Sequence, residues 1–315
     1  MAEPFIPEYI TVHLGTPNSN APNVTVPFPE YIKNLSLKDT LPETNENDPS
    51  FTEYITGENG VIDKWLKIGA KGIRLDVADE LPDIFIDELR DRLKLTKPDA
   101  LLMGEVWEDA TTKHSYGSRR RYLLGSQFDS VMNYPFANAI LDFCRNGKAE
   151  GFMETVMQIV ENYPKQCLDV MMNHIGTHDT ERAITKIAGD SCEYRDRTWQ
   201  AAHSLDDEKY AKGVKLLKCA AALQYTLPGV PSVYYGDEAG MQGYKDPFNR
   251  GCYPWGKENQ ELVTFYRTMG EIRRNNKVFC DGYFSPVSGM LGCVAFRRHN
   301  ENGDIMFACE LEYKN

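Results

Sequence analysis

From Gly60 onward, apolar runs alternate with segments of helical periodicity, and this alternation is the feature that most restricts the fold. Five apolar runs have the composition of buried strands: 72–77, 100–106, 130–134, 170–175 and 231–235. Helical patterns lie around and between them, at 61–68, 83–93, 137–144, 152–161, 209–227 and 260–275. Strands that alternate with helices form a parallel sheet or barrel that the helices cover. The sequence therefore predicts an α/β fold.

Two of the predicted strands end in a carboxylate. The strand that starts at residue 72 leads to Asp76, with Arg74 two residues before it, and the next strand leads to Glu105, with Trp107 two residues after it. Side chains alternate along a strand, so we expect Arg74 and Asp76 to point the same way. Active sites of parallel barrels form at the C-terminal ends of the strands. The two carboxyl groups are therefore candidates for cleaving a glycosidic bond, a reaction that uses such a pair.

The surroundings of the two carboxyl groups predict different charge states. A guanidinium group beside Asp76 favours the ionised form, which a nucleophile requires, whereas apolar neighbours of Glu105 favour the protonated form, which a general acid requires. Neighbouring strands lie about 4.8 Å apart, close to the roughly 5–5.5 Å between the carboxyl groups of retaining glycosidases. The alternative is structural, because acidic residues at strand ends often cap helices or form ion pairs. We favour that interpretation for Asp79 and Glu80.

A third polar segment, 176–182 (GTHDTER), follows the predicted strand at residue 170. His178 and Asp179 in this segment could hydrogen-bond sugar hydroxyls and stabilise an oxocarbenium-like transition state. Equally, a Thr or Asp before Glu181 would make a good start for a helix. Spacing alone does not decide between the two interpretations.

Composition restricts the partners and the compartment. The 315 residues carry a formal net charge of −11 and 11% aromatic residues, which suits a neutral glucan and argues against nucleic acid. No apolar stretch approaches the roughly 20 residues of a membrane span, and the N-terminus has no signal-peptide pattern. The eight cysteines lack CxxC spacing. We therefore expect a cytoplasmic protein with reduced thiols and no membrane partner.

These segments together resemble the α-amylase family of glycoside hydrolases, which are retaining enzymes on a (β/α)8 barrel. The segment 72–80 (GIRLDVADE) is similar to the fourth-strand motif of the family, 104–109 (GEVWED) to the fifth, and 176–182 to the seventh. The resemblance implies that Asp76 is the nucleophile, Glu105 the general acid/base and Asp179 the transition-state stabiliser. It makes Arg74 and His178 their supporting contacts.

Further segments resemble the neopullulanase and cyclomaltodextrinase branch: 40–45 (TLPETN), 128–136 (FDSVMNYPF), 229–238 (GVPSVYYGDE) and 246–250 (DPFNR) with Trp255. The last resembles a sugar-binding loop, so Asp246 and Arg250 join Trp107 as candidate substrate-binding residues. The tetrapeptide VADE stands where VANE is more usual, which leaves the exact glucan open. Calcium occurs in the family, but its usual ligands come largely from a part with no counterpart here. We therefore predict no metal and no other cofactor.

The first three strands of the family barrel have no counterpart in the sequence. The fold prediction is an incomplete (β/α)8 TIM-type barrel with the equivalents of strands 4–8 over residues 35–277, followed by the start of a small β domain at 278–315, which we expect to be cut short. Missing strands would leave exposed sheet edges. The segment 169–174 (DVMMNH) imitates a third-strand motif but directly precedes the seventh. We therefore expect His174 to be structural.

Residues 1–34 do not resemble this family and are weakly similar to the start of peptidoglycan-binding proteins of spore-forming bacteria. We therefore predict that 1–34 is an unrelated N-terminal segment, joined near residues 34–35 by a fusion.

Two functions follow. The first is a retaining α-glucan hydrolase that cleaves α-1,4 bonds of maltodextrins, cyclodextrins or pullulan by double displacement, with activity impaired by the truncation. The alternative is a non-catalytic barrel remnant that binds glucan weakly. The sequence leaves open the oligomeric state and the choice between hydrolysis and glycosyl transfer.

Overall fold

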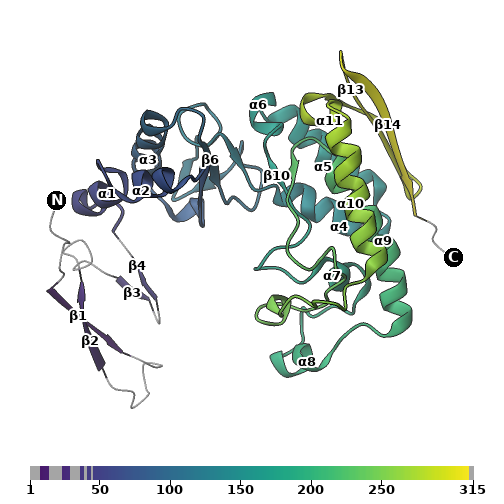
Figure 1. Ribbon diagram of the computed structural model, residues 1–315, viewed down its shortest axis with the longest axis horizontal. Coiled ribbons are helices and arrows are strands. Elements are labelled where there is room, and N and C mark those ends of the chain that lie inside the picture. The colour runs from purple at the N-terminus through teal and green to yellow at the C-terminus, as the bar shows by residue number, and fades with distance from the viewer. Residues whose placement is uncertain (1–7, 14–22, 29–35, 39–40, 44, 312–315) are drawn as a thin grey trace. The chain divides into compact units, whose positions relative to one another are not determined.

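The computed structural model describes residues 8–13, 23–28, 36–38, 41–43 and 45–311, with side chains from residue 45 onward. The chain forms two compact units. The first comprises 1–103 with 124–128, and the second comprises 104–123 with 129–315. Figure 1 shows the chain from the N-terminus to the C-terminus.

The N-terminal part of the first unit contains two strand pairs. Strand β1 (Glu8–His13) pairs antiparallel with β2 (Asn23–Phe28), and β3 (Ser36–Lys38) pairs antiparallel with β4 (Leu41–Glu43). The sequence of this part also predicts strands at 9–14 and 24–26, and β1 and β2 confirm both, with residue 14 outside the described residues. The predicted junction near residues 34–35 lies outside the described residues. So do residues 40 and 44 of the segment 40–45 (TLPETN).

The remainder of the first unit packs helices beside two neighbouring strands. Its elements are α1 (Pro49–Thr56), α2 (Val61–Ile68), β5 (Gly72–Leu75), the 3-10 helix η2 (Ala78–Glu80), α3 (Asp83–Thr96) and β6 (Leu101–Gly104). Helices α1, α2 and α3 contact one another. Asp63 of α2 is buried and accepts hydrogen bonds from Arg92 and Thr96 of α3. The hydrogen bond from Arg92 holds the pKa of Asp63 well below its usual range, so this ion pair ties α2 to α3.

The second unit contains a row of sequential strands. Its strands are β7 (His114–Ser115), β8 (Ser118–Arg119), β9 (Ser130–Val131), β10 (Met172–Asn173) and β11 (Val230–Pro231). The Met132 amide donates to the Gly104 carbonyl at 3.0 Å, and Met132 forms a parallel bridge to Met172. Strand β10 pairs parallel with β11. Strands β6, β9, β10 and β11 thus neighbour one another in chain order, as in the wall of a β/α barrel, whereas β7 and β8 form a separate antiparallel pair.

The predicted strand 130–134 is too long at its C-terminal end. Helix α4 (Tyr134–Asn146) begins at Tyr134, because the Asn133 side chain accepts a hydrogen bond from the Phe136 amide and a proline follows in the first turn. The predicted strand 231–235 is also wrong beyond Pro231, where the backbone leaves strand geometry.

Further helices belong to this unit. They are α5 (Ala149–Asn162), α6 (Lys165–Leu168), α7 (Ala183–Ala188), α8 (Arg197–Ala202), α9 (Asp207–Thr226), η3 (Phe248–Arg250), α10 (Gln260–Asn275) and α11 (Val278–Asp281). Helix α9 contacts α4, α7 and α10 (Figure 1). Its buried face includes Leu217, Ala220 and Leu223, so the long helix supplies much of the core of this unit.

A three-stranded antiparallel sheet ends the described chain. Strands β12 (Tyr283–Met290), β13 (Cys293–Asn300) and β14 (Gly303–Glu310) follow one another in order, which confirms the small C-terminal β domain. The buried Arg298 of β13 donates to the carbonyls of Thr226 and Gly282.

A disulfide joins Cys219 of α9 to Cys309 of β14, whereas the other six cysteines form no disulfide in the described structure. The expectation of reduced thiols is therefore wrong for this pair, because the fold brings together two cysteines that lie 90 residues apart. No described helix is long and apolar enough to cross a membrane.

Candidate active site

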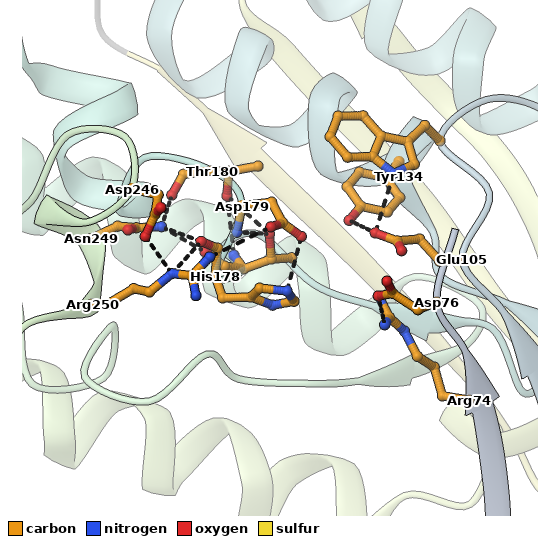
Figure 2. Close-up of polar contacts among 12 residues, drawn as sticks. Arg74, Asp76, Glu105, Tyr134, His178, Asp179, Thr180, Asp246, Asn249 and Arg250 are labelled. Carbon is orange, nitrogen blue, oxygen red and sulfur yellow. Dashed lines mark hydrogen bonds and ion pairs between the residues drawn. The ribbon is translucent and has the colours of Figure 1, made fainter. Parts of the chain in front are cut away.

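Arg74 and Asp76 lie in the first unit, at the end of β5. Their side chains form an ion pair between Arg74 Nη1 and Asp76 Oδ1 (Figure 2). This contact confirms that the two residues share a face. The Asp76 side chain is 73% exposed. The next residue, Val77, has φ of 41°, a left-handed conformation that a β-branched residue rarely adopts. Such strain is common beside functional residues.

Glu105 lies in the second unit, directly after β6, and is only 3% exposed. Trp107 Nε1 donates to Glu105 Oε1 at 3.2 Å, and the Tyr134 hydroxyl donates to the same oxygen at 3.1 Å (Figure 2). The rings of Trp107 and Tyr134 stack with centroids 5.0 Å apart. Burial raises the pKa of Tyr134, and the neighbouring Glu105 charge adds to this. The phenol therefore stays protonated and acts as a donor.

His174 packs against the Tyr134 ring of the stacked pair Trp107 and Tyr134, which we call the aromatic corner. It is 2% exposed, and its ring packs edge-on against Tyr134 with centroids 4.5 Å apart. Burial lowers the pKa of His174 to about 4, so the imidazole is neutral near pH 7. The structure thus gives His174 a packing contact with the ring that donates to Glu105.

Asp179 lies on a turn of the second unit that is closed by threonine side chains. Thr177 Oγ1 accepts from the Asp179 amide at 3.1 Å, and the Thr177 amide donates to Thr180 Oγ1 at 3.1 Å. His178 Nε2 lies 3.1 Å from Asp179 Oδ2. Helix α7 begins four residues after Asp179, with Arg182 at the N-cap position and no side-chain cap. The capping interpretation of Asp179 is therefore wrong.

Asp246 and Arg250 lie beside this turn. Arg250 Nε is 2.7 Å from Asp246 Oδ1 and also donates to the His178 carbonyl at 3.1 Å, while Arg250 Nη2 is 3.8 Å from Asp179 Oδ1 (Figure 2). The structure therefore brings four of the predicted site residues into one polar cluster. Trp255, from the same loop, is 82% exposed.

Three contacts of the site were not predicted from the sequence. The first is the Tyr134 hydroxyl on Glu105, and the second is the Asn249 side chain behind Asp179. The third is a buried ion pair between Arg182 and Asp237, 3.3 Å apart, in which the guanidinium group also lies over the rings of Tyr234 and Tyr235. Burial raises the pKa of Asp237 to about 7, against the opposing charge of Arg182. These residues lie within or beside quoted motifs, but sequence spacing gave no indication of their partners.

Among the described residues, no group of three or more His, Cys, Asp or Glu side chains is arranged to hold a metal ion.

The comparisons with known proteins agree with this architecture. The family model "Alpha amylase, catalytic domain" matches residues 31–281. The chain belongs to the α-amylase family. It is 36% identical over 280 residues to an amylopullulanase of Thermoanaerobacter thermohydrosulfuricus, covering 83% of this chain and 18% of that protein. It is 33% identical over 290 residues to a cyclomaltodextrinase of Thermoanaerobacter pseudethanolicus, covering 90% and 44%.

Solved structures show the same relationship. A cyclomaltodextrinase matches with a TM-score of 0.70 and 32% identity, over 85% of this chain and 41% of that one. The Nostoc punctiforme debranching enzyme soaked with acarbose matches with a TM-score of 0.69 and 28% identity, over 85% and 53%. The chain thus has the α-amylase catalytic fold and spans about half or less of the length of these relatives.

Proposed function

We propose that this chain is a retaining α-glucan hydrolase that cleaves α-1,4 bonds of maltodextrins, cyclodextrins or pullulan by double displacement. The observation that carries the proposal is the Glu105 carboxyl group, which is buried and accepts hydrogen bonds from Trp107 and Tyr134. The two donors fix the orientation of this carboxyl group, and a group that transfers a proton to or from a substrate must be held in position. Membership of the α-amylase family, with relatives named for α-glucan hydrolysis, supports the choice of substrate.

In the proposed mechanism, Asp76 attacks the anomeric carbon while Glu105 protonates the leaving glycosidic oxygen. A covalent glycosyl-enzyme forms, and Glu105 then takes a proton from the water that releases the sugar. The adjacent Arg74 forms an ion pair with Asp76 and so orients its carboxylate. The assignment of both carboxyl groups to one reaction follows the motif resemblance, in which Asp76 belongs to the fourth-strand motif and Glu105 to the fifth.

Asp179 is proposed to stabilise the positive charge of the oxocarbenium-like transition state, with His178 at its side. Asp246 and Arg250 are proposed to bind the sugar beyond the cleaved bond, and Trp107 and Trp255 to contact pyranose faces. These roles follow the motif resemblance, and the polar cluster around Asp179 supports them. No metal or other cofactor enters the proposed reaction.

We also propose that this chain carries the second half of the barrel, equivalent to strands 4–8, and that residues 1–34 are foreign to it. Strands β5, β6, β9, β10 and β11 match this count among the described residues. Part of the sugar-binding surface would then be missing, so we expect low activity from the chain alone.

The direct test is the release of reducing sugar from maltodextrin and a cyclodextrin by the purified chain, compared with Asp76→Asn. The matched control is Asp79→Asn, the same chemical change three residues away in η2. We expect Asp76→Asn to abolish release and Asp79→Asn to retain most of it. Equal rates in all three proteins would exclude catalysis at Asp76. A compact wild-type chain without activity would instead favour the non-catalytic remnant.

A further inference from the structure

Asn249 lies in η3, behind the turn that carries Asp179, and its side chain is fully buried. Its Nδ2 atom is 2.7 Å from the His178 carbonyl, 2.7 Å from the Thr180 carbonyl and 3.4 Å from the Thr177 carbonyl (Figure 2). An amide nitrogen carries two protons. The two short contacts account for both protons, and the contact with Thr177 is weaker.

These carbonyls belong to the residues on either side of Asp179. Holding the His178 carbonyl restrains the peptide group between His178 and Asp179, and holding the Thr180 carbonyl restrains the peptide group between Thr180 and Glu181. Arg250 adds a second donor to the His178 carbonyl at 3.1 Å. Asn249 lies 71 residues further along the chain than His178. Its hydrogen bonds, which we call the Asn249 clamp, are therefore tertiary contacts that add to the local hydrogen bonds of Thr177 and Thr180.

The chemistry of the site requires a neutral donor at position 249. Backbone carbonyls only accept hydrogen bonds, so the amide nitrogen must face them. Asn249 Oδ1 is buried and has no hydrogen-bond partner among the described residues, which means that the amide is oriented by its donor end alone. An aspartate at this position would place a carboxylate oxygen against carbonyl oxygens.

We propose that Asn249 is a positioning residue for the reaction, which acts by holding the backbone on both sides of Asp179 so that its carboxylate meets the developing positive charge. The inference rests on the proposed function of Asp179. It assigns to Asn249 no contact with the sugar, so its contribution depends on Asp179 being able to act.

The test is a double-mutant cycle with Asn249→Asp and Asp179→Asn, measured as kcat and KM on α-maltosyl fluoride. This activated substrate keeps slow variants measurable. A misplacement of about 1 Å costs roughly 100-fold in rate, so we expect Asn249→Asp to lower kcat by about that factor with little change in KM. In the Asp179→Asn background, we expect less than about a threefold further loss, because coupled residues are not additive.

Asn249→Ser keeps one hydroxyl donor, so we expect it to give an intermediate loss in kcat. If Asn249→Asp fails to fold, Asn249→Ser replaces it in the double-mutant cycle. The matched control is Asn276→Asp, which removes an amide that donates to the Ile272 carbonyl at the end of α10 and should leave kcat within about twofold. An equal loss in both Asp179 backgrounds, or no loss in the wild-type background, would overturn the inference. An inactive wild-type chain would contradict the proposed function, and this inference with it.

Discussion

Glu105 and Asp179 belong to the same unit but are held in different ways. Glu105 is buried, and two aromatic side chains donate to its Oε1 atom. Asp179 has a side chain that is 31% exposed and lies on a turn whose carbonyls accept from Asn249 and Arg250. Aromatic donors therefore hold the first carboxyl group, whereas the second has charged neighbours, His178 and Arg250, and lies on a turn that is held through its backbone. Substitutions in the two regions should therefore lower kcat or stability for different physical reasons.

The largest effect is expected from Glu105→Gln, which removes the proposed proton donor. General acid–base catalysis contributes about 100- to 10,000-fold, so we expect roughly a 1,000-fold loss of kcat on maltodextrin. Fluoride leaves without needing a proton, so α-maltosyl fluoride should be turned over with a much smaller loss. An equal loss on both substrates would show that Glu105 does not act as an acid.

The buried His174 makes the aromatic corner sensitive to acid. Its folded pKa of about 4 lies below the usual 6.5, so its stabilising contribution is complete above about pH 6.5 and is lost as pH falls through about 4. The difference corresponds to about 3 kcal/mol of unfolding free energy. Urea unfolding at pH 7 and pH 4 should show this loss in the wild type and a reduced loss in His174→Gln. The exposed control His114→Gln should behave as the wild type does, and identical pH dependence in all three proteins would contradict the prediction.

A smaller effect is expected from Tyr134→Phe, which removes one donor to Glu105 but keeps the ring that packs against Trp107 and His174. A hydrogen bond of this kind contributes about 1–1.5 kcal/mol, so kcat on maltodextrin should fall about tenfold. Tyr194→Phe is the matched control, because Tyr194 is 92% exposed. If both variants keep wild-type kcat, the aromatic corner does not orient Glu105.

The smallest effect is expected near the Asp179 turn, at Cys192. Its thiol donates to Glu181 Oε1 at 3.0 Å, and burial raises the pKa of Cys192 to about 11, so it stays a thiol at neutral pH. Cys192→Ala should lower the free energy of unfolding by about 1 kcal/mol and leave kcat within about twofold, and Cys192→Ser should recover most of the stability. A large loss of kcat in Cys192→Ala would mean that the turn depends on this buried contact as well as on Asn249.

The two regions also differ in how much of them could be predicted from the sequence. Helices 61–68 and 260–275 were predicted with the observed bounds, because their apolar periodicity is clear and their ends are marked. Helix α1 was missed because it lies in a stretch rich in Pro, Asn and acidic residues. Trp107 stands two residues after Glu105 in the sequence, and their hydrogen bond shows that such a local pair can be recognised as one site.

The Asn249 clamp was not predicted, because its partners are about 70 residues away in the chain. Local patterns predict which side chains share a strand face, but they carry no information about which loop returns to a given carbonyl. The disulfide between Cys219 and Cys309 was missed for the same reason.

The most direct test of the central claim is to trap the glycosyl-enzyme and find the residue that carries it. The chain is incubated with a 5-fluoro-α-glucosyl fluoride, digested and mapped by mass spectrometry. We expect one glycosyl adduct, on the peptide that contains Asp76, and none on Asp76→Asn. An adduct on a different carboxylate, or turnover of maltodextrin with no covalent adduct and with inversion at the anomeric carbon, would contradict it.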